Sequence, residues 1–337
     1  MKPGSPGLNP ARLLRLMEAA VEACRLNLSG AIVLTEAASG PYVVTPVLAA
    51  MAKAASVVAL ARTSRYGSSA EVSAETSALA RMAGVADRVE IVTEKLPAMV
   101  ARADVVTNSG HLRPIDAAMV GWMKPTAVVP LMFEAWELDA RANDVDLQAL
   151  RRRGIAVAGT NERHPAVDVF SFLGTMAAKL LLDAGVAPYR ARVALLCDNP
   201  FANWLVDGLA ACGAHVSLHA SLEEAVAGQP PDALVVALRP GQAPVFGPAE
   251  AGKVAASWPG TVVAQFWGDI DRASLTAAGV PYWPTDVPAP GHMGVLPSAV
   301  GPEPVVRLQA GGLKVGEVLL RPDAQRSEFD RSFVDAL

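Results

Sequence analysis

The chain has 337 residues, of which 52% are hydrophobic, and its formal net charge is −4. This length exceeds that of one ordinary hydrophobic core, so we expect two domains. No block of lysines and arginines occurs, which argues against nucleic acid or an anionic membrane surface as a partner.

Export and membrane insertion are not expected either. The first ten residues have no hydrophobic signal core, and no run of 18 uncharged apolar residues follows. The three cysteines, Cys24, Cys197 and Cys212, stand in apolar runs without CxxC spacing. We interpret them as small core residues in a reducing compartment. The prediction is a soluble, cytoplasmic protein.

The first half of the chain alternates short strands with helices. An amphipathic helix begins at Asn9-Pro10 and makes up an N-terminal segment, residues 1–28. A first domain, residues 29–165, follows it. Its predicted strands are 31–35, 56–61, 89–92, 104–107, 126–132 and 155–159, and its clearest helices are 41–53 and 70–83. Such alternation implies a parallel sheet with right-handed crossovers.

The second half repeats this alternation. A long apolar helix, 166–184, ends at Gly185 and is predicted to join the domains as segment 166–186. The second domain is expected at 187–322 and includes a closing helix near 302–320. The charged segment 323–337 is expected to be a flexible tail. The predicted fold class is therefore α/β: two Rossmann-like, doubly wound parallel-sheet domains joined by an inter-domain helix, the second of them Rossmann- or flavodoxin-like.

The loop after the first strand occupies the place of a dinucleotide-binding turn. It has small residues, Ser39 and Gly40, before the expected helix, but it lacks the GxGxxG pattern that lets a backbone approach a pyrophosphate. Glu36 would place a carboxylate near the phosphates, which is unfavourable unless a cation intervenes. The corresponding loop of the second half, 197–203, also lacks glycines, so the first domain is the better cofactor candidate.

The second strand ends in Arg62, Ser64 and Arg65, where an NAD-preferring unit usually has Asp or Glu. Two arginines suit a 2′-phosphate or another anion, and the alternative is a pair of solvated surface arginines. We therefore expect NADP or NAD as cofactor, held by Ser39, Gly40, Arg62, Ser64 and Arg65. No metal site is expected.

The segment from Ala103 to Pro165 carries a family resemblance. It contains Ala103-Asp104-Val105-Val106, Met123-Lys124-Pro125-Thr126-Ala127-Val128, Asp146-Leu147-Gln148-Ala149-Leu150 and Gly154-Ile155-Ala156-Val157-Ala158-Gly159. In this order it resembles the second half of the nucleotide domain of D-2-hydroxyacid dehydrogenases, over about a fifth of the chain. The resemblance implies a Rossmann-like domain and nicotinamide chemistry. The place of the family's catalytic arginine holds 133–137 (Phe-Glu-Ala-Trp-Glu), so the family's catalytic residues are not carried over.

Three strand ends in this region are loaded with polar residues, as expected of a crevice beyond the carboxyl ends of parallel strands. Asn108, His111 and Arg113 follow one strand. Histidine serves as a general acid or base near neutral pH, and arginine binds a carboxylate with two hydrogen bonds. The alternative is a pair that only stabilises the loop.

The next two strand ends carry Glu134 and Glu137, and then Asn161, Glu162 and His164. A partly buried glutamate has a raised pKa or a cationic partner, and either is common in active sites. The alternatives are a helix N-terminal charge for the glutamates and a plain turn residue for Asn161. Because residues 161–164 precede the inter-domain helix, we expect them to face a cleft between the domains.

Histidines in the second half carry weaker signals. His292 stands between two glycines, where it would reach across the cleft to substrate or cap a turn. His215 and His219 lie on one short strand without partners at metal-ligand spacing, and we interpret them as structural.

The leading hypothesis is an NAD(P)-linked oxidoreductase acting on a small polar, carboxylate-bearing metabolite in the cleft. His111, Glu134 and His164 are the catalytic candidates, and Arg113, Asn108, Asn161 and His292 the substrate-binding ones. One alternative is a redox-neutral lyase, cyclodeaminase or transferase that uses a nucleotide or nucleotide-sugar, and another is a non-catalytic ligand-binding protein. The apolar faces of the first and closing helices are compatible with a homodimer.

Overall fold

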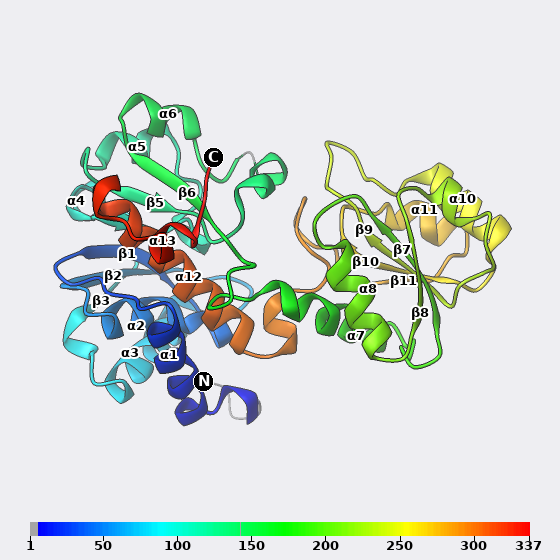
Figure 1. Ribbon diagram of the computed structural model, residues 1–337, viewed down its shortest axis with the longest axis horizontal. Helices are drawn as coiled ribbons and strands as arrows, with labels where there is room; N and C mark the ends of the chain where they lie inside the picture. The colour runs from blue at the N-terminus through cyan, green and yellow to red at the C-terminus, as the bar shows by residue number, and fades with distance from the viewer. Residues whose placement is uncertain (1–5, 142) are drawn as a thin grey trace. The chain divides into compact units, whose positions relative to one another are not determined.

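The structure is a computed structural model that describes residues 6–141 and 143–337, so the first five residues of the expected N-terminal segment lie outside it. The chain forms two compact units. Unit 1 combines the chain up to Val169 with Gly301–Leu337, and unit 2 is Phe170–Val300. Each unit is an α/β domain built on its own sheet (Figure 1).

Unit 1 contains a seven-stranded sheet in the order β12-β6-β5-β4-β1-β2-β3. Its strands are β1 (Ile32–Ala37), β2 (Ser56–Ala61), β3 (Val89–Val92), β4 (Val105–Val106), β5 (Val128–Pro130), β6 (Ala156–Thr160) and β12 (Val334–Asp335). The first six run parallel, and β12 pairs antiparallel with β6. The order 3-2-1-4-5-6 is that of a doubly wound dinucleotide-binding fold, with its switch point between β1 and β4.

Helices cover both faces of this sheet. They are α1 (Pro10–Ala23), α2 (Val44–Met51), α3 (Ser69–Met82), α4 (Pro97–Arg102), α5 (Ala117–Trp122), α6 (Leu147–Arg152), α12 (Glu303–Leu320) and α13 (Glu328–Arg331). The 3-10 turns are η1 (Pro6–Leu8), η2 (Gly40–Val43), η3 (Ala86–Arg88), η4 (Gly110–Leu112), η5 (Ala135–Arg141) and η8 (Asp323–Gln325).

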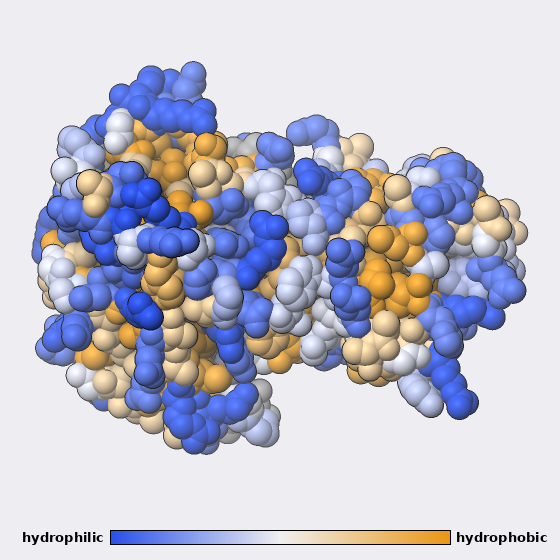
Figure 2. Space-filling model, viewed as in Figure 1, coloured by the Kyte–Doolittle hydropathy of each residue, from blue (hydrophilic) through white to orange (hydrophobic). Residues whose placement is uncertain are grey.

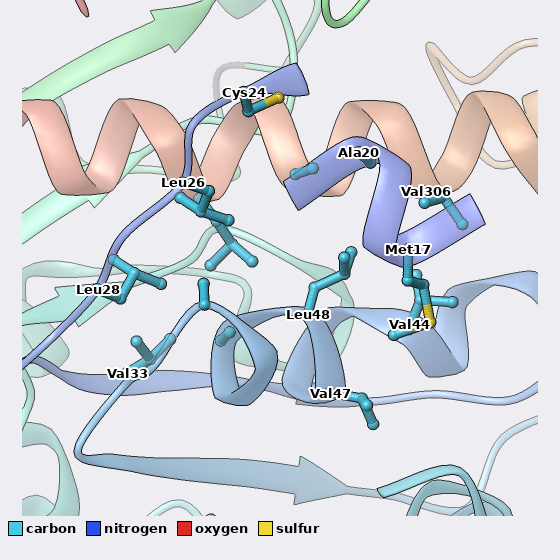
Figure 3. Packing of buried hydrophobic residues seen from close by; sticks show 14 of the residues in the cluster. Met17, Ala20, Cys24, Leu26, Leu28, Val33, Val44, Val47, Leu48 and Val306 are labelled. Carbon is cyan, nitrogen blue, oxygen red and sulfur yellow. The ribbon is translucent and has the colours of Figure 1, made fainter. Parts of the chain in front are cut away.

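Neighbouring residues of the strands face opposite cores, as the two-residue repeat of a β-strand requires. Val33 lies in a core with α1, α2 and α12, whereas Leu34 lies in a second core with α5 and α6. Figure 3 shows the first core, where Met17 and Leu48 lie among the buried side chains of α1 and α2 near α12. The apolar face of α1 is therefore used within unit 1 and is not free to pair with a second copy of the chain.

The closing helix α12 belongs to unit 1 and not to the second domain, contrary to the expected boundary at 187–322. It packs against β4, β5 and β6, and glycines allow this close approach. A Cβ on Gly312 would come within 2.1 Å of Met132 Sδ, and one on Gly316 within 2.8 Å of Val105. The chain thus leaves unit 1 after Val169 and returns to complete its core.

The expectation of a flexible tail at 323–337 is wrong. This segment contains α13 and β12, and Phe333 is fully buried. Its register with β6 pairs Val334 with Thr160. Buried ion pairs hold it as well: Lys314 Nζ lies 2.9 Å from Asp330 Oδ1, and Arg321 Nη2 lies 2.9 Å from the same oxygen.

Unit 2 contains a five-stranded sheet in the order β11-β10-β9-β7-β8, with all pairs parallel. Its strands are β7 (Arg192–Cys197), β8 (His215–His219), β9 (Ala233–Ala237), β10 (Val262–Trp267) and β11 (Tyr282–Trp283). Its helices are α7 (Leu173–Asp183), α8 (Ala202–Ala211), α9 (Leu222–Ala225), α10 (Pro248–Ser257) and α11 (Arg272–Ala277), with 3-10 turns η6 (Phe170–Phe172) and η7 (Pro297–Val300). This order corresponds to 2-1-3-4-5, the flavodoxin-like arrangement.

Two further expectations need correction. The predicted inter-domain helix 166–184 begins only at Leu173 after η6, and it lies inside unit 2. Cys24 and Cys197 are buried as expected, and burial raises their pKa values to about 12 and about 11. Cys212, however, follows the last turn of α8 and is exposed.

Within the described residues, no helix combines the length and hydropathy needed to cross a bilayer. The face drawn in Figure 2 mixes hydrophilic and hydrophobic residues, and hydrophobic ones gather on unit 2 near α8.

Candidate functional site

The carboxyl ends of the parallel strands in unit 1 bring the main candidates to one edge of one sheet. Glu36 lies near the end of β1, His111 follows β4, Glu134 follows β5 and His164 follows β6. The convergence expected from the alternating pattern is therefore present. The residues fall into two groups, one at β1–β4 and one at β5–β6.

Glu36 occupies the switch point between β1 and β4. The strand extends to Ala37, two residues further than predicted, so that Glu36 is part of the strand and only 8% exposed. Its Oε2 accepts a hydrogen bond from the backbone N–H of His111 at 3.0 Å. Burial raises the pKa of Glu36, and the His111 N–H and the Arg113 charge only partly offset this. The carboxyl thus takes the backbone donor that an anion would otherwise use at this position.

Hydroxyl and amide groups join β1 to β4 beside Glu36. Thr107 Oγ1 donates to Thr35 Oγ1 at 2.9 Å and lies 2.7 Å from Ser109 Oγ. Asn108, which is 2% exposed, accepts from the backbone N–H of Met132 at 2.8 Å through Oδ1. Its Nδ2 is buried without a hydrogen-bond partner. An unpaired buried donor is costly, and it makes Asn108 suited to hold a ligand oxygen.

Cationic side chains surround His111. Burial lowers the pKa of His111, and the charges of Arg62 and Arg113 lower it further. Lys95, which follows β3, donates from Nζ to the carbonyl oxygen of Leu112 at 3.2 Å. Arg113 is paired with Asp144, with Nη1 and Oδ2 2.8 Å apart. Sequence reasoning missed Lys95, although its place just beyond a predicted strand end was the same signal that singled out Arg62.

The second group contains three buried glutamates. Glu134 is fully buried; its Oε1 accepts from Arg163 Nε at 3.0 Å and its Oε2 from Trp136 Nε1 at 2.6 Å. Glu137 lies 3.2 Å from Arg141 Nη2, and burial raises its pKa. Burial and the charges of Glu137 and Glu134 raise the pKa of Glu162 well above its ordinary value. Both oxygens of Glu134 are thus engaged within the protein.

His164 and Asn161 contact the C-terminal segment of unit 1. His164 Nδ1 accepts from the backbone N–H of Ala166 at 3.1 Å, and its ring stacks on Phe333 with centroids 3.8 Å apart. Asn161 Nδ2 donates to the carbonyl oxygen of Ser332 at 2.9 Å. These partners lie in the strand-forming tail, which no local sequence pattern places here. These contacts tie residues 161–164 to the C-terminal segment of unit 1.

Most of the proposed cofactor residues are engaged in their own loops. Ser64 pairs with Gly67 through both backbone groups, and its Oγ accepts from the backbone N–H of Tyr66. Arg65 lies over the Tyr66 ring at 4.8 Å, and Ser39 Oγ donates to the Tyr66 carbonyl oxygen at 3.4 Å. Gly40 begins η2, so a 3-10 turn precedes α2. Arg62 stands apart from these loop contacts.

His292 belongs to unit 2, where its backbone N–H donates to the carbonyl oxygen of Ala289. The switch point of unit 2, between β7 and β9, repeats the arrangement seen at Glu36. Asp198 Oδ1 accepts from the backbone N–H of Arg239 at 2.9 Å, and Asn199 Nδ2 donates to the Ala237 carbonyl oxygen at 2.6 Å. In both units an acidic side chain spans the switch point. Among the described residues, no group of three or more His, Cys, Asp or Glu side chains is placed to hold a metal ion.

Comparison with known proteins shows the fold. No family model and no curated protein matches the chain. A dipicolinate synthase component from Bacillus halodurans is similar in structure, with a TM-score of 0.53, 15% identity, and 88% of this chain and 100% of that chain covered. The dipicolinate synthase structure from Bacillus subtilis gives 0.52 and 12%, covering 85% and 95%.

The NAD⁺-bound 3-phosphoglycerate dehydrogenase from Entamoeba histolytica is also among the similar structures, with a TM-score of 0.47, 8% identity, and 85% and 93% covered. Together with the two strand orders, the similarity to the dipicolinate synthase structures confirms the predicted two-domain, Rossmann-like α/β fold.

Proposed function

We propose that this chain is an NAD(P)-linked oxidoreductase that acts on a small polar, carboxylate-bearing metabolite at the carboxyl edge of the unit 1 sheet. The observation that carries the proposal is the convergence of Glu36, Asn108 and His111 at the switch point of a 3-2-1-4-5-6 sheet. This is where ligands of open α/β sheets bind. The Rossmann-like fold supports the redox class.

Each residue of this group has a distinct chemical capacity. The unpaired Nδ2 of Asn108 offers a hydrogen bond to a carbonyl or hydroxyl oxygen of the substrate. A lowered pKa keeps the His111 imidazole neutral at pH 7, so that it accepts a proton from a substrate hydroxyl. Asp144 orients the Arg113 guanidinium, which would anchor a substrate carboxylate. In this proposal Glu134, Asn161 and His164 position the loops around the site, and His292 remains a candidate substrate contact.

A nicotinamide cofactor fits this edge on one condition. Ser39, Gly40 and Arg62 would hold its phosphates, and an ionised Glu36 would repel them. Burial raises the pKa of Glu36, and a protonated carboxyl would tolerate a neighbouring phosphate. When bound, the cofactor supplies the hydride acceptor or donor, while this chain's residues bind the substrate and move the proton.

A thermal-shift titration with NADPH and NADH at pH 6 and pH 8 tests the proposal. We expect stabilisation by at least one dinucleotide, stronger at pH 6, and further strengthened by Glu36→Gln because the neutral amide removes the repulsion. Glu18→Gln is the matched control, since it removes one negative charge on the exposed side of α1. If neither dinucleotide stabilises the wild type or Glu36→Gln at either pH, the redox proposal fails.

A second candidate is a redox-neutral enzyme, namely a lyase, cyclodeaminase or transferase that uses a nucleotide or nucleotide-sugar. The acidic side chains across both switch points favour it, because Glu36 and Asp198 place carboxyls at the ends of the first strands, beside the turns where a pyrophosphate usually binds. Stabilisation by nucleotides or nucleotide-sugars, without response to dinucleotides, would favour this candidate. Stabilisation without turnover of any kind would instead indicate a ligand-binding protein.

A further inference from the structure

Three strand ends of unit 1 place basic side chains around one loop. Arg62 directly follows β2, where Ala61 pairs with Ala37 of β1. Lys95 follows β3, whose Val92 pairs with Leu60 of β2. The Lys95 side chain extends back over the sheet edge, because its Nζ donates to the Leu112 carbonyl oxygen at 3.2 Å in the loop after β4. His111 precedes Leu112 in that loop, so the three side chains converge from β2, β3 and β4.

Nearby carboxylates are committed to other partners. Asp116 acts on Lys95 only through its charge, since its Oδ1 accepts from the Met119 N–H at the start of α5. Within residues 6–141 and 143–337, none of Arg62, Lys95 and His111 forms an ion pair. Of the Lys95 ammonium's three donors, the structure engages one with Leu112 and directs another to Met119 Sδ at 3.7 Å.

The positive charges of this group act on one another. Burial lowers the pKa of Lys95, the Asp116 charge partly offsets this effect, and the Arg62 charge lowers the pKa further. Arg62 has the same effect on His111. Basic groups held near one another in partly buried positions are stabilised by an anion between them.

We propose that Arg62, Lys95 and His111 form a binding site for a doubly charged oxyanion of the phosphate type. An arginine fork and a lysine ammonium are the usual partners of such a group, and a histidine ring adds an N–H donor. The inference rests in part on the proposed function, since it assigns the anionic part of a ligand to the same edge. It adds Lys95 and His111 to the expected anion contacts, so that three side chains and not Arg62 alone would bind the anion.

The test is calorimetric titration of the full chain with inorganic phosphate in an amine buffer at constant ionic strength, with chloride as the reference ion. We expect saturable phosphate binding, weakened about tenfold by each of Arg62→Gln and Lys95→Met and abolished by the double variant. Arg81→Gln, on the exposed surface of α3, is the matched control and is expected to bind phosphate like the wild type. Unfolding curves check that each variant is folded.

Two further titrations identify the source of the anion. If NADPH binds at least tenfold tighter than NADH and Arg62→Gln removes the difference, the oxyanion is the cofactor's 2′-phosphate, and His111 then contacts the cofactor in place of the substrate hydroxyl. If phosphate binds but NADPH and NADH bind with equal affinity, the oxyanion belongs to the substrate. If phosphate binds but neither dinucleotide does, the oxidoreductase proposal fails while this anion site stands. Absence of phosphate binding, or equal binding by the folded double variant, overturns the site.

Discussion

The Glu36 carboxyl occupies the space that a side chain on Gly110 would need. A Cβ on Gly110 would lie 1.4 Å from Glu36 Oε2, and Gly110 has a φ of +40°. Glycine after β4 therefore has two roles: it permits the left-handed turn and it leaves room for the carboxyl that spans the switch point.

We expect Gly110→Ala to destabilise unit 1 by about 2–3 kcal/mol, from the positive φ and from the loss of the Glu36 hydrogen bond to His111. Chemical denaturation of the folded chain measures this. Gly84→Ala is the matched control, because Gly84 also has a positive φ of +69° but has open space around it. If the two variants lose equal stability, Glu36 does not depend on Gly110 for its position.

Buried Glu162 should make the stability depend on pH. Burial, with the charges of Glu137 and Glu134, raises the pKa of Glu162 in the folded state. The contribution of Glu162 to the free energy of unfolding is therefore complete below its unfolded-state pKa of about 4.3, and it is lost as the pH rises through the folded-state pKa. Between these two pKa values, the free energy of unfolding of the wild type should fall, relative to that of Glu162→Gln, by up to about 1.4 kcal/mol for each pH unit.

Urea denaturation of both proteins from pH 4.5 to 8.5 checks this prediction. Glu18→Gln, on the exposed side of α1, controls for simple loss of one negative charge. Parallel stability curves for the wild type and Glu162→Gln would show that Glu162 has no unusual pKa.

The Lys314–Asp330 ion pair should be a main anchor of the C-terminal segment. Burial alone would raise the pKa of Asp330, but hydrogen bonds from Arg321, Ser327 and Lys314 outweigh it and hold this pKa well below its ordinary value. Asp330→Asn leaves the buried Lys314 with Glu317, 2.9 Å away, as its remaining carboxylate, and we expect a loss of about 2 kcal/mol at pH 7.

The loss caused by Asp330→Asn should shrink as pH falls below about 4, because the carboxyl then takes up a proton in the unfolded wild type while it stays ionised in the folded protein. Asp323→Asn is the control, since Asp323 pairs with Arg331 at the surface and is 72% exposed. Its effect should stay below about 1 kcal/mol. Equal effects of the two substitutions at pH 7 would contradict the anchoring role.

Local sequence patterns were sufficient to place the strand ends. Parallel strands that alternate with helices must all direct their carboxyl ends to one edge, which is why Glu36, His111 and Glu134 could be assigned to that edge from the chain alone. The same argument predicted both sheets. Lys95 met the same criterion, because it follows the predicted strand 89–92 directly, but it was not among the candidates.

Long-range contacts could not be predicted in this way. The return of α12 to unit 1 depends on packing with strands more than 140 residues earlier, and Gly312 and Gly316 inside a helix are locally unfavourable. The charged composition of 323–337 favoured a flexible tail, whereas one residue, Phe333, fills a core position. The stacking of His164 on Phe333 therefore cannot be predicted from the residues around His164 in the sequence.

His164 should make the contact between this segment and β6 sensitive to acid. Its Nδ1 accepts from the Ala166 N–H and therefore carries no proton, and burial lowers its pKa. The His164 contribution to stability is complete above its unfolded-state pKa of about 6.5 and is lost as the pH falls through its folded-state pKa.

His164→Asn preserves an acceptor for Ala166 but cannot titrate and loses the stacking on Phe333. We expect this variant to be about 1–2 kcal/mol less stable at pH 7.5, with the difference narrowing towards pH 5. Proteolysis after residue 320 should accelerate at pH 5 in the wild type more than in the variant, and His215→Asn, on an edge strand of unit 2, should behave like the wild type. A constant difference between wild type and His164→Asn from pH 7.5 to 5 would show that this histidine does not control the segment.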